Sequence, residues 1–300
     1  MNKKILRYFT LTALIAVIVL GIWYFTKPYD YTVTFESKTL PGTINQSLKL
    51  WVKSLDNSKI IESNSINNIK QNFNYNDDSY TYNWILDNKH DSLTKVTVDI
   101  TGSKSNISNR IAHIFKNTKL KQRSKDNIHD FMTLLQSHLE SHDVKIIGEA
   151  MSPEVYCAYL SFQTEQMLKA NEMMKSYNYL STELLKNKIE LQGNPMVEIT
   201  RWDKKKDSIY FNFCFPIVEI DSLPKHPKIK YKTIKSQKSI KAIYHGNYIS
   251  SDRAWYKLLH YAENENIKLN SKPIEVFHNN PMYGREDRNW KTEIYMPIKE

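Results

Sequence analysis

The longest uninterrupted hydrophobic stretch of the chain lies near its N-terminus, from Tyr8 to Phe25. It carries no charge over a length that matches the ~30 Å hydrocarbon core of a bilayer when it is coiled as a helix. More basic residues precede this stretch than follow it, which favours a cytoplasmic N-terminus. The aromatic end of the stretch lacks the small residues of a signal-peptide cleavage site. The pattern predicts a cytoplasmic tip and an uncleaved single-pass transmembrane helix in residues 1–27, with residues 28–300 extracytoplasmic, in the periplasm.

Beyond residue 27, apolar and polar residues alternate as they do in half-buried strands. A first strand is predicted at residues 31–36, and helical spacing then predicts a short amphipathic helix at residues 44–55. Further strands are expected near residues 70–75, 80–86 and 93–101, followed by an amphipathic helix at residues 125–142. The pattern therefore predicts antiparallel strands followed by one long helix.

This order of elements, together with the strand texture at residues 84–86 (WIL) and 94–98 (TKVTV), resembles the START-like fold of the SRPBCC or polyketide-cyclase family. The resemblance covers residues 28–147. It implies an α+β helix-grip domain whose last helix lies across a curved sheet and closes a cavity. Whether such a cavity is functional here is left open by the sequence.

The second half of the chain repeats itself. Residues 156–217 and 240–298 each read as strand, amphipathic helix and hairpin, with an L-x-x-x-P entry and an F/M-P-I ending. Because one βαββ unit cannot cover its own sheet face, a pair of units is the economical interpretation. We therefore expect residues 148–300 to form one α+β domain with two pseudo-symmetric halves and a groove between them.

Three motifs in this half occur in a characteristic order: YHGNY at residues 244–248, PIEVF at 273–277 followed by Asn280-Pro281, and TEIYMPI at 292–298. They resemble the gyrase-inhibitor-like (GyrI-like) effector-binding domain, which is found at the ligand-sensing end of bacterial transcription activators. The resemblance covers residues 148–300 and implies a small-molecule ligand in the groove between the two halves. No DNA-binding motif accompanies it.

The last strand of each copy supplies the candidate ligand-binding residues. Side-chain alternation places Glu293 and Tyr295 on one face, with Tyr210 and Asn212 at matching positions in the first copy. A carboxylate in an aromatic groove attracts an organic cation or a hydrogen-bond donor. The resemblance also assigns the glutamate of TEIY as the family's central ligand-contacting acid, so Glu293 is the first candidate. The alternative is a surface glutamate on an edge strand.

Three further residues are weaker candidates for the same groove. Glu275 could approach the groove or remain a rim charge. Trp255 could form a ligand wall or, like the apolar residues at the same helical spacing, a core anchor. Trp290 lies just before the last strand and could flank the groove.

Composition and charge exclude several other classes of protein. The net charge is +10, but four of the basic residues lie in the first 27 positions, and no nucleic-acid-binding motif is present. No glycine-rich phosphate loop or catalytic triad motif occurs, so we expect no cofactor and no catalytic residue. His138 and His142 stand four apart but lack a third ligand, so no metal site is predicted. Cys157 and Cys214 could form a disulfide or remain buried thiols.

The leading hypothesis is a membrane-anchored extracytoplasmic protein that binds amphipathic or cationic organic molecules and no nucleic acid. One alternative is a hydrolase of small electrophiles, with Glu293 as general base and Tyr295 as proton donor. Another is a structural envelope protein with a vestigial groove, because Asn212 replaces the acid in the first copy. The ligand, the protein partner and the oligomeric state are not determined by the sequence.

Overall fold

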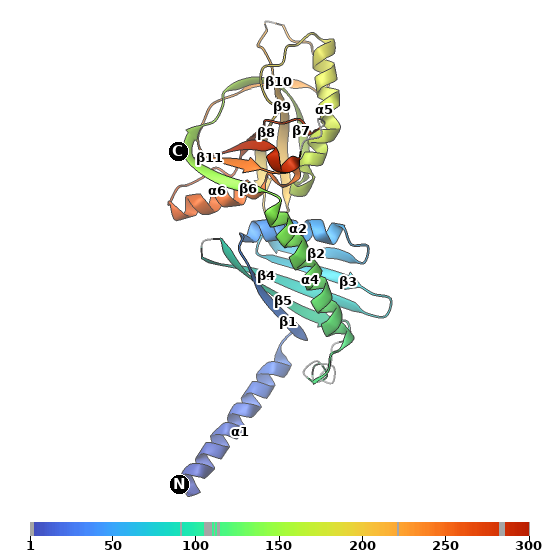
Figure 1. The fold of residues 1–300 in the computed structure, drawn as a ribbon, viewed down its shortest axis with the longest axis vertical. Helices are drawn as coiled ribbons and strands as arrows, with labels where there is room; N and C mark the ends of the chain where they lie inside the picture. The colour runs from blue at the N-terminus through green and yellow to red at the C-terminus, as the bar shows by residue number, and fades with distance from the viewer. Residues whose placement is uncertain are drawn as a thin grey trace.

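The structure is a computed structural model that describes residues 3–90, 92–104, 110, 112, 115–220, 222–281 and 286–299. Its two sheets are arranged one after the other along the molecule, with α1 (Lys3–Thr26) at the N-terminal end (Figure 1).

The α1 helix covers the N-terminal hydrophobic stretch. Among the described residues, no helix combines the length and the apolar character that a bilayer crossing requires. Two lysines begin α1, and Arg7 lies in its second turn. The predicted transmembrane helix, and with it that part of the predicted fold class, was wrong. The extracytoplasmic location rested on this helix and stays an untested prediction.

The first sheet has five antiparallel strands in the order β1-β5-β4-β3-β2. The predicted elements of this part are present, and β2 was missed because its sequence, SKIIESNS, lacks an apolar alternation. In chain order the elements are β1 (Tyr31–Ser37), α2 (Pro41–Lys53), β2 (Ser58–Ser65), β3 (Asn68–Asn74), β4 (Ser79–His90), β5 (Leu93–Gly102) and α4 (Lys119–Glu140).

The long helix α4 lies across this sheet (Figure 1) and buries the apolar stripe Ile128, Phe131 and Leu135 against it. The ring of Phe131 lies 5.4 Å from that of Trp51 on α2 and 5.1 Å from that of Trp84 on β4. Large aromatic side chains therefore occupy the space between sheet and helix, which stabilises the domain by apolar burial.

The second sheet has eight antiparallel strands in the order β10-β7-β9-β8-β12-β13-β11-β6. In chain order, the first half of this domain contains β6 (Asp143–Met151), β7 (Val155–Glu165), η1 (Gln166–Leu168), α5 (Lys169–Lys186), β8 (Met196–Asp203) and β9 (Ser208–Pro216). The second half of the domain contains β10 (Lys230–Ile234), β11 (Lys238–His245), η2 (Tyr248–Ser250), α6 (Arg253–Asn264), β12 (Ile274–Phe277), η4 (Asp287–Asn289) and β13 (Lys291–Pro297).

The two halves exchange their outermost strands. β6 precedes the first copy of the repeat but pairs with β11 of the second, and β10 precedes the second copy but pairs with β7 of the first. At the centre, β8 pairs with β12, where Ile274 faces Glu198 and Val276 faces Met196. Each half is thus a βαββ unit to which one strand from the other half is added. The domain boundary expected between residues 147 and 148 falls inside β6.

The eight-stranded sheet has two different faces. One packs against α5 and α6 through a large core that includes Trp255, Phe211 and Phe213. The other carries a smaller cluster with Cys157 and Cys214, whose thiols are buried and free. The alternation of side chains along each strand separates the two sets.

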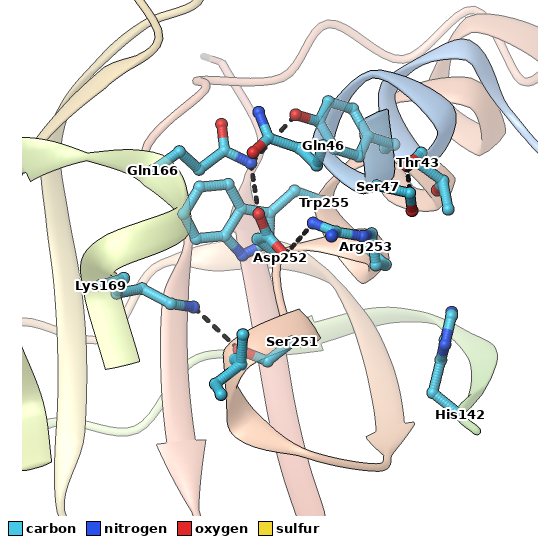
Figure 2. A network of polar contacts seen from close by, with 12 residues as sticks. Thr43, Gln46, Ser47, His142, Gln166, Lys169, Ser251, Asp252, Arg253 and Trp255 are labelled. Atoms are coloured by element: carbon cyan, nitrogen blue, oxygen red, sulfur yellow. Dashed lines mark hydrogen bonds and ion pairs between the residues drawn. The ribbon is translucent and has the colours of Figure 1, made fainter. Parts of the chain in front are cut away.

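Polar side chains gather where α2 of the first domain meets α6 of the second (Figure 2), and His138 of α4 joins them. Arg253 donates to Asp252 Oδ1 at 2.7 Å and to His138 Nε2 at 3.3 Å, while Gln166 donates to Asp252 Oδ2 at 2.5 Å. Burial, then the neighbouring charge of Arg253, lowers the pKa of His138 to about 3, so this imidazole is neutral. The junction is therefore a buried hydrogen-bonded network rather than a loose contact.

Candidate functional site

An apolar pocket of about 400 Å³ opens between α5 of the first half and the η2 segment of the second half. One wall is formed by Ala170, Met173, Met174 and Tyr177 of α5, and the other by Tyr248, Ile249, Phe277 and Trp290. Concave, largely apolar sites of this size with a few polar groups are typical of small-molecule binding. The pocket is therefore the candidate ligand site.

The aromatic wall is held by Tyr248. Its ring centroid lies 4.7 Å from that of Phe277 and 5.1 Å from that of Trp290. Its hydroxyl donates to Asn279 O at 3.0 Å and accepts from Asn279 N at 2.9 Å, and burial raises its pKa to about 12. The wall is thus fixed by both ring contacts and hydrogen bonds before any ligand arrives.

Trp290 contributes its ring to this region. Its side chain lines the pocket, while its indole Nε1 is buried and has no hydrogen-bond partner among the described residues. A buried donor without a partner is unfavourable by ~1–3 kcal/mol.

A charged pair lies in the core next to the pocket, at the start of α5. Lys169 donates to the carboxylate of Glu275, and the two side chains are 1% and 0% exposed. The same carboxylate accepts from Trp255 Nε1 at 2.7 Å, and the Lys169 ammonium lies 4.8 Å from the centroid of the Trp255 ring. Figure 2 shows Lys169 and Trp255 converging with Ser251, which accepts from Lys169 at 2.8 Å. The carboxylate is therefore fully neutralised by the chain itself.

These contacts place two predicted site residues in the core. Glu275 is fully buried, so the alternative of a rim charge was wrong. Trp255 is also fully buried and does not line the pocket, so it is a core anchor. Phe277, two residues along the same strand as Glu275, is the member of the PIEVF motif that lines the pocket.

Glu293, the first candidate from sequence, lies on the opposite, helix-free face of the sheet. Its carboxylate contacts Lys291 Nζ at 2.7 Å and Lys241 Nζ at 2.9 Å, and accepts from the Tyr295 hydroxyl at 2.7 Å. Burial alone would raise the pKa of Glu293, but hydrogen bonds from Lys291, Lys241 and Tyr295 outweigh it and lower the pKa to about 2. This acid is charged and already paired.

The equivalent position of the first half repeats this arrangement with different residues. Asn212 accepts from Ser161 at 2.8 Å and donates to Glu198 at 2.7 Å, and Glu198 forms an ion pair with Lys232. Tyr210 lies two positions along the strand, with the Arg201 guanidinium 5.3 Å from its ring centroid. Sequence alignment of the copies missed Glu198 because this acid comes from β8 rather than β9.

Of the seven residues predicted for the site, Trp290 alone lines the pocket. The other six fall into two groups. Glu275 and Trp255 lie in the core, and the helix-free face carries Tyr210, Asn212, Glu293 and Tyr295. The methionines of α5 were not predicted, because a helical stripe of methionine and tyrosine is equally typical of an ordinary core. Tyr248 and Phe277 belong to motifs that the sequence had already singled out.

Comparison with known proteins identifies residues 152–299 as matching the family of GyrI-like small molecule binding domains. This match confirms the resemblance of the second half, while the START-like resemblance of the first half is not shown. A search of curated proteins found no match.

Solved structures with a similar arrangement include the C-terminal domain of EcmrR, at 16% identity and TM-score 0.44 over 53% of this chain and 98% of that one. SAV2435 bound to tetraphenylphosphonium is similar at 14% identity and TM-score 0.34, over 53% of this chain and 93% of that one. A hydrolase from Listeria innocua is similar at 10% identity and TM-score 0.34, over 52% of this chain and 92% of that one.

Proposed function

We propose that this chain, whose residues 152–299 form a GyrI-like small-molecule-binding domain, binds a neutral, largely apolar organic molecule in the pocket between α5 and η2. The observation that carries the proposal is the pocket itself, with alanine, methionine and tyrosine side chains of α5 on one wall and edge-to-face and tilted aromatic rings on the other. Burial of apolar surface there provides ~25 cal/mol per Å² as driving force.

The charge of the ligand follows from the buried acid next to the pocket. Glu275 is neutralised by Lys169, while Glu293 lies on the opposite face of the sheet and is paired with Lys241 and Lys291. A cationic ligand would have to displace Lys169 to pair with Glu275, whereas a neutral molecule leaves this pair intact. Of the two classes expected from sequence, the amphipathic one is therefore favoured over the cationic one.

The test is binding of Nile red, a neutral and environment-sensitive dye, to the full chain. Met174→Trp should narrow the pocket, since Met174 lines it with a 64% exposed side chain that tolerates substitution. We expect at least about a tenfold loss of affinity, or ~1.4 kcal/mol. Leu185→Trp, on the same helix and 77% exposed, is the matched control and should bind normally. Equal affinity of Met174→Trp and wild type, or no binding by either, would contradict the proposal.

The two alternatives from sequence are less well supported. A general base works best with a pKa near the operating pH, and the pKa of Glu293 is about 2, which makes it a weak base. The structural role rested on a vestigial groove, whereas a pocket of about 400 Å³ is present.

For the first domain we propose a START-like helix-grip fold that acts as a support rather than as a ligand chamber. The order of strand, short helix, antiparallel strands and long helix supports the fold. The packing of Trp51, Trp84 and Phe131 between sheet and helix supports the absence of a ligand role.

A further inference from the structure

A second cavity, of about 620 Å³, lies where the two domains meet. Residues of α2 and β2 from the first domain form one side, and residues of β7, η1 and the turn between β8 and β9 form the other. It shares no lining residue with the apolar pocket. We call it the lysine cleft, because five of the residues that line it are lysines.

The charges in the lysine cleft do not balance. Its two carboxylates are both engaged: Asp207 with Lys49 at 3.0 Å, and Glu165 with Lys53 at 2.5 Å. The other three lysines, at positions 59, 205 and 206, have no carboxylate partner among the described residues. Three like charges around one cleft repel each other, and an anion between them would remove that repulsion.

The turn that carries two of these lysines is held in place by the side chain of Asp203. The carboxylate of Asp203 accepts from the backbone N–H groups of Lys205 at 3.2 Å and Lys206 at 3.1 Å. The preceding Lys204 does not line the cleft; its ammonium lies 4.5 Å from the centroid of the Trp202 ring. The run of three lysines is thus divided, with two of them directed to the cleft wall.

Asp207 connects this turn to both domains. It has a left-handed backbone with φ of 50°, which an aspartate adopts more readily than most residues. Its carboxylate accepts from Gln46 of α2 at 2.7 Å, and its carbonyl accepts from Gln166 N at 3.1 Å. The lysines of the turn are therefore positioned relative to Lys59 on β2, across the domain boundary.

We infer that the lysine cleft binds a small organic anion with at least two negative charges, such as a phosphate monoester. Lysine ammonium groups bind phosphate as mobile point charges, and three of them suit a dianion. Val52, Ile60 and Met167 also line the cleft and provide an apolar surface for the organic part of the ligand. Since the walls come from both domains, the anion bridges them.

The test uses the full chain, with phenyl phosphate and inorganic phosphate as probes in isothermal titration calorimetry at low salt. Phenyl phosphate is expected to bind, and more tightly than inorganic phosphate, with an affinity that falls as salt rises. The triple substitution Lys59→Gln, Lys205→Gln and Lys206→Gln should weaken it at least about tenfold. All three side chains are exposed, so the fold should be retained, as circular dichroism will show.

The matched control removes the same charge elsewhere: Lys225→Gln, Lys228→Gln and Lys230→Gln, three exposed lysines outside the cleft. It should bind phenyl phosphate within about twofold of wild type. An equal loss of phenyl phosphate affinity in both triple variants would show that the ligand responds only to net charge, and would overturn the inference. Absence of binding by wild type would also overturn it. If inorganic phosphate binds as tightly as phenyl phosphate, the inferred contribution of an organic group is wrong. Nile red affinity should not change in either triple variant, so this test and that of the proposed function fail independently.

Discussion

The ammonium of Lys169 and the carboxylate of Glu275 form an ion pair that is wholly buried between α5 and β12, with side-chain exposures of 1% and 0%. The partners are 106 residues apart in the chain. Because Lys169 already neutralises Glu275, this carboxylate is not available to pair with a cationic ligand.

Breaking this pair should be strongly destabilising. Lys169→Met leaves an unpaired carboxylate in the core, and we expect a loss of ~3–5 kcal/mol in the free energy of unfolding. The double variant Lys169→Met, Glu275→Gln removes both charges and keeps an acceptor for Trp255, so most of the loss should be recovered. Urea unfolding measures both. A double variant as unstable as the single one would show that the charges are not the cause.

The same substitution should change ligand preference. With Lys169 removed, Glu275 is a buried acid in need of a cation, so Lys169→Met should bind tetraphenylphosphonium at least about tenfold more tightly than wild type. Affinity for the neutral triphenylphosphine oxide should change far less. Lys175→Met, an exposed position on the same helix, is the control. If wild type already prefers the cation, the neutral-ligand proposal is wrong.

Glu293 should contribute stability that acid removes. Its pKa is about 2 in the folded protein against 4.5 without partners, so the folded state binds fewer protons than the unfolded state as pH falls. The contribution is present above pH 4.5 and is lost as pH falls towards 2, with a size of up to about 3 kcal/mol. Glu293→Gln should be destabilised at pH 7, and the difference from wild type should shrink by pH 3. Glu149→Gln, in an exposed pair with Lys238, should show little effect.

His138 should make the domain junction sensitive to mild acid. Its pKa is lowered from 6.5 to about 3. Between these pH values, His138 is therefore protonated in the unfolded chain and neutral in the folded protein. The free energy of unfolding should therefore fall by up to ~1.4 kcal/mol per pH unit between these values. His138→Gln should flatten this slope, while His129→Gln, at an exposed position of the same helix, should leave it unchanged. Urea unfolding at pH 7 and pH 5 distinguishes the two.

The packing of α2 against α6 should be sensitive to a single methyl group. A Cβ added at Gly42 would overlap the Tyr256 ring, so Gly42→Ala forces the helices apart. We expect a loss of ~1–3 kcal/mol. In a double-mutant cycle with Tyr256→Ala, the two effects should be less than additive, because the smaller side chain relieves the clash. Additive losses would contradict a direct contact.

Local periodicity was enough for many of the secondary-structure elements. The alternation at Tyr80, Tyr82 and Trp84 and the stripe of Ile128, Phe131 and Leu135 are short-range patterns, and both appear as expected on β4 and α4. The duplication of the second half was also visible, because repeated motifs need no knowledge of the fold. The apolar stretch in residues 8–25 shows the limit of this approach, since hydrophobicity did not establish a membrane span.

Long-range placement could not be derived in this way. The sequence alone indicated α+β domains, a duplicated effector-binding module and a set of acids and aromatic residues near its motifs. The exchange of β6 and β10, the pairing of Glu275 with Lys169, and the division of the candidate residues between core, pocket and helix-free face were decided by the tertiary structure. The physical reason is that strand and helix periods depend on neighbours a few residues away. Charge pairing and pocket shape depend instead on side chains that only packing brings together.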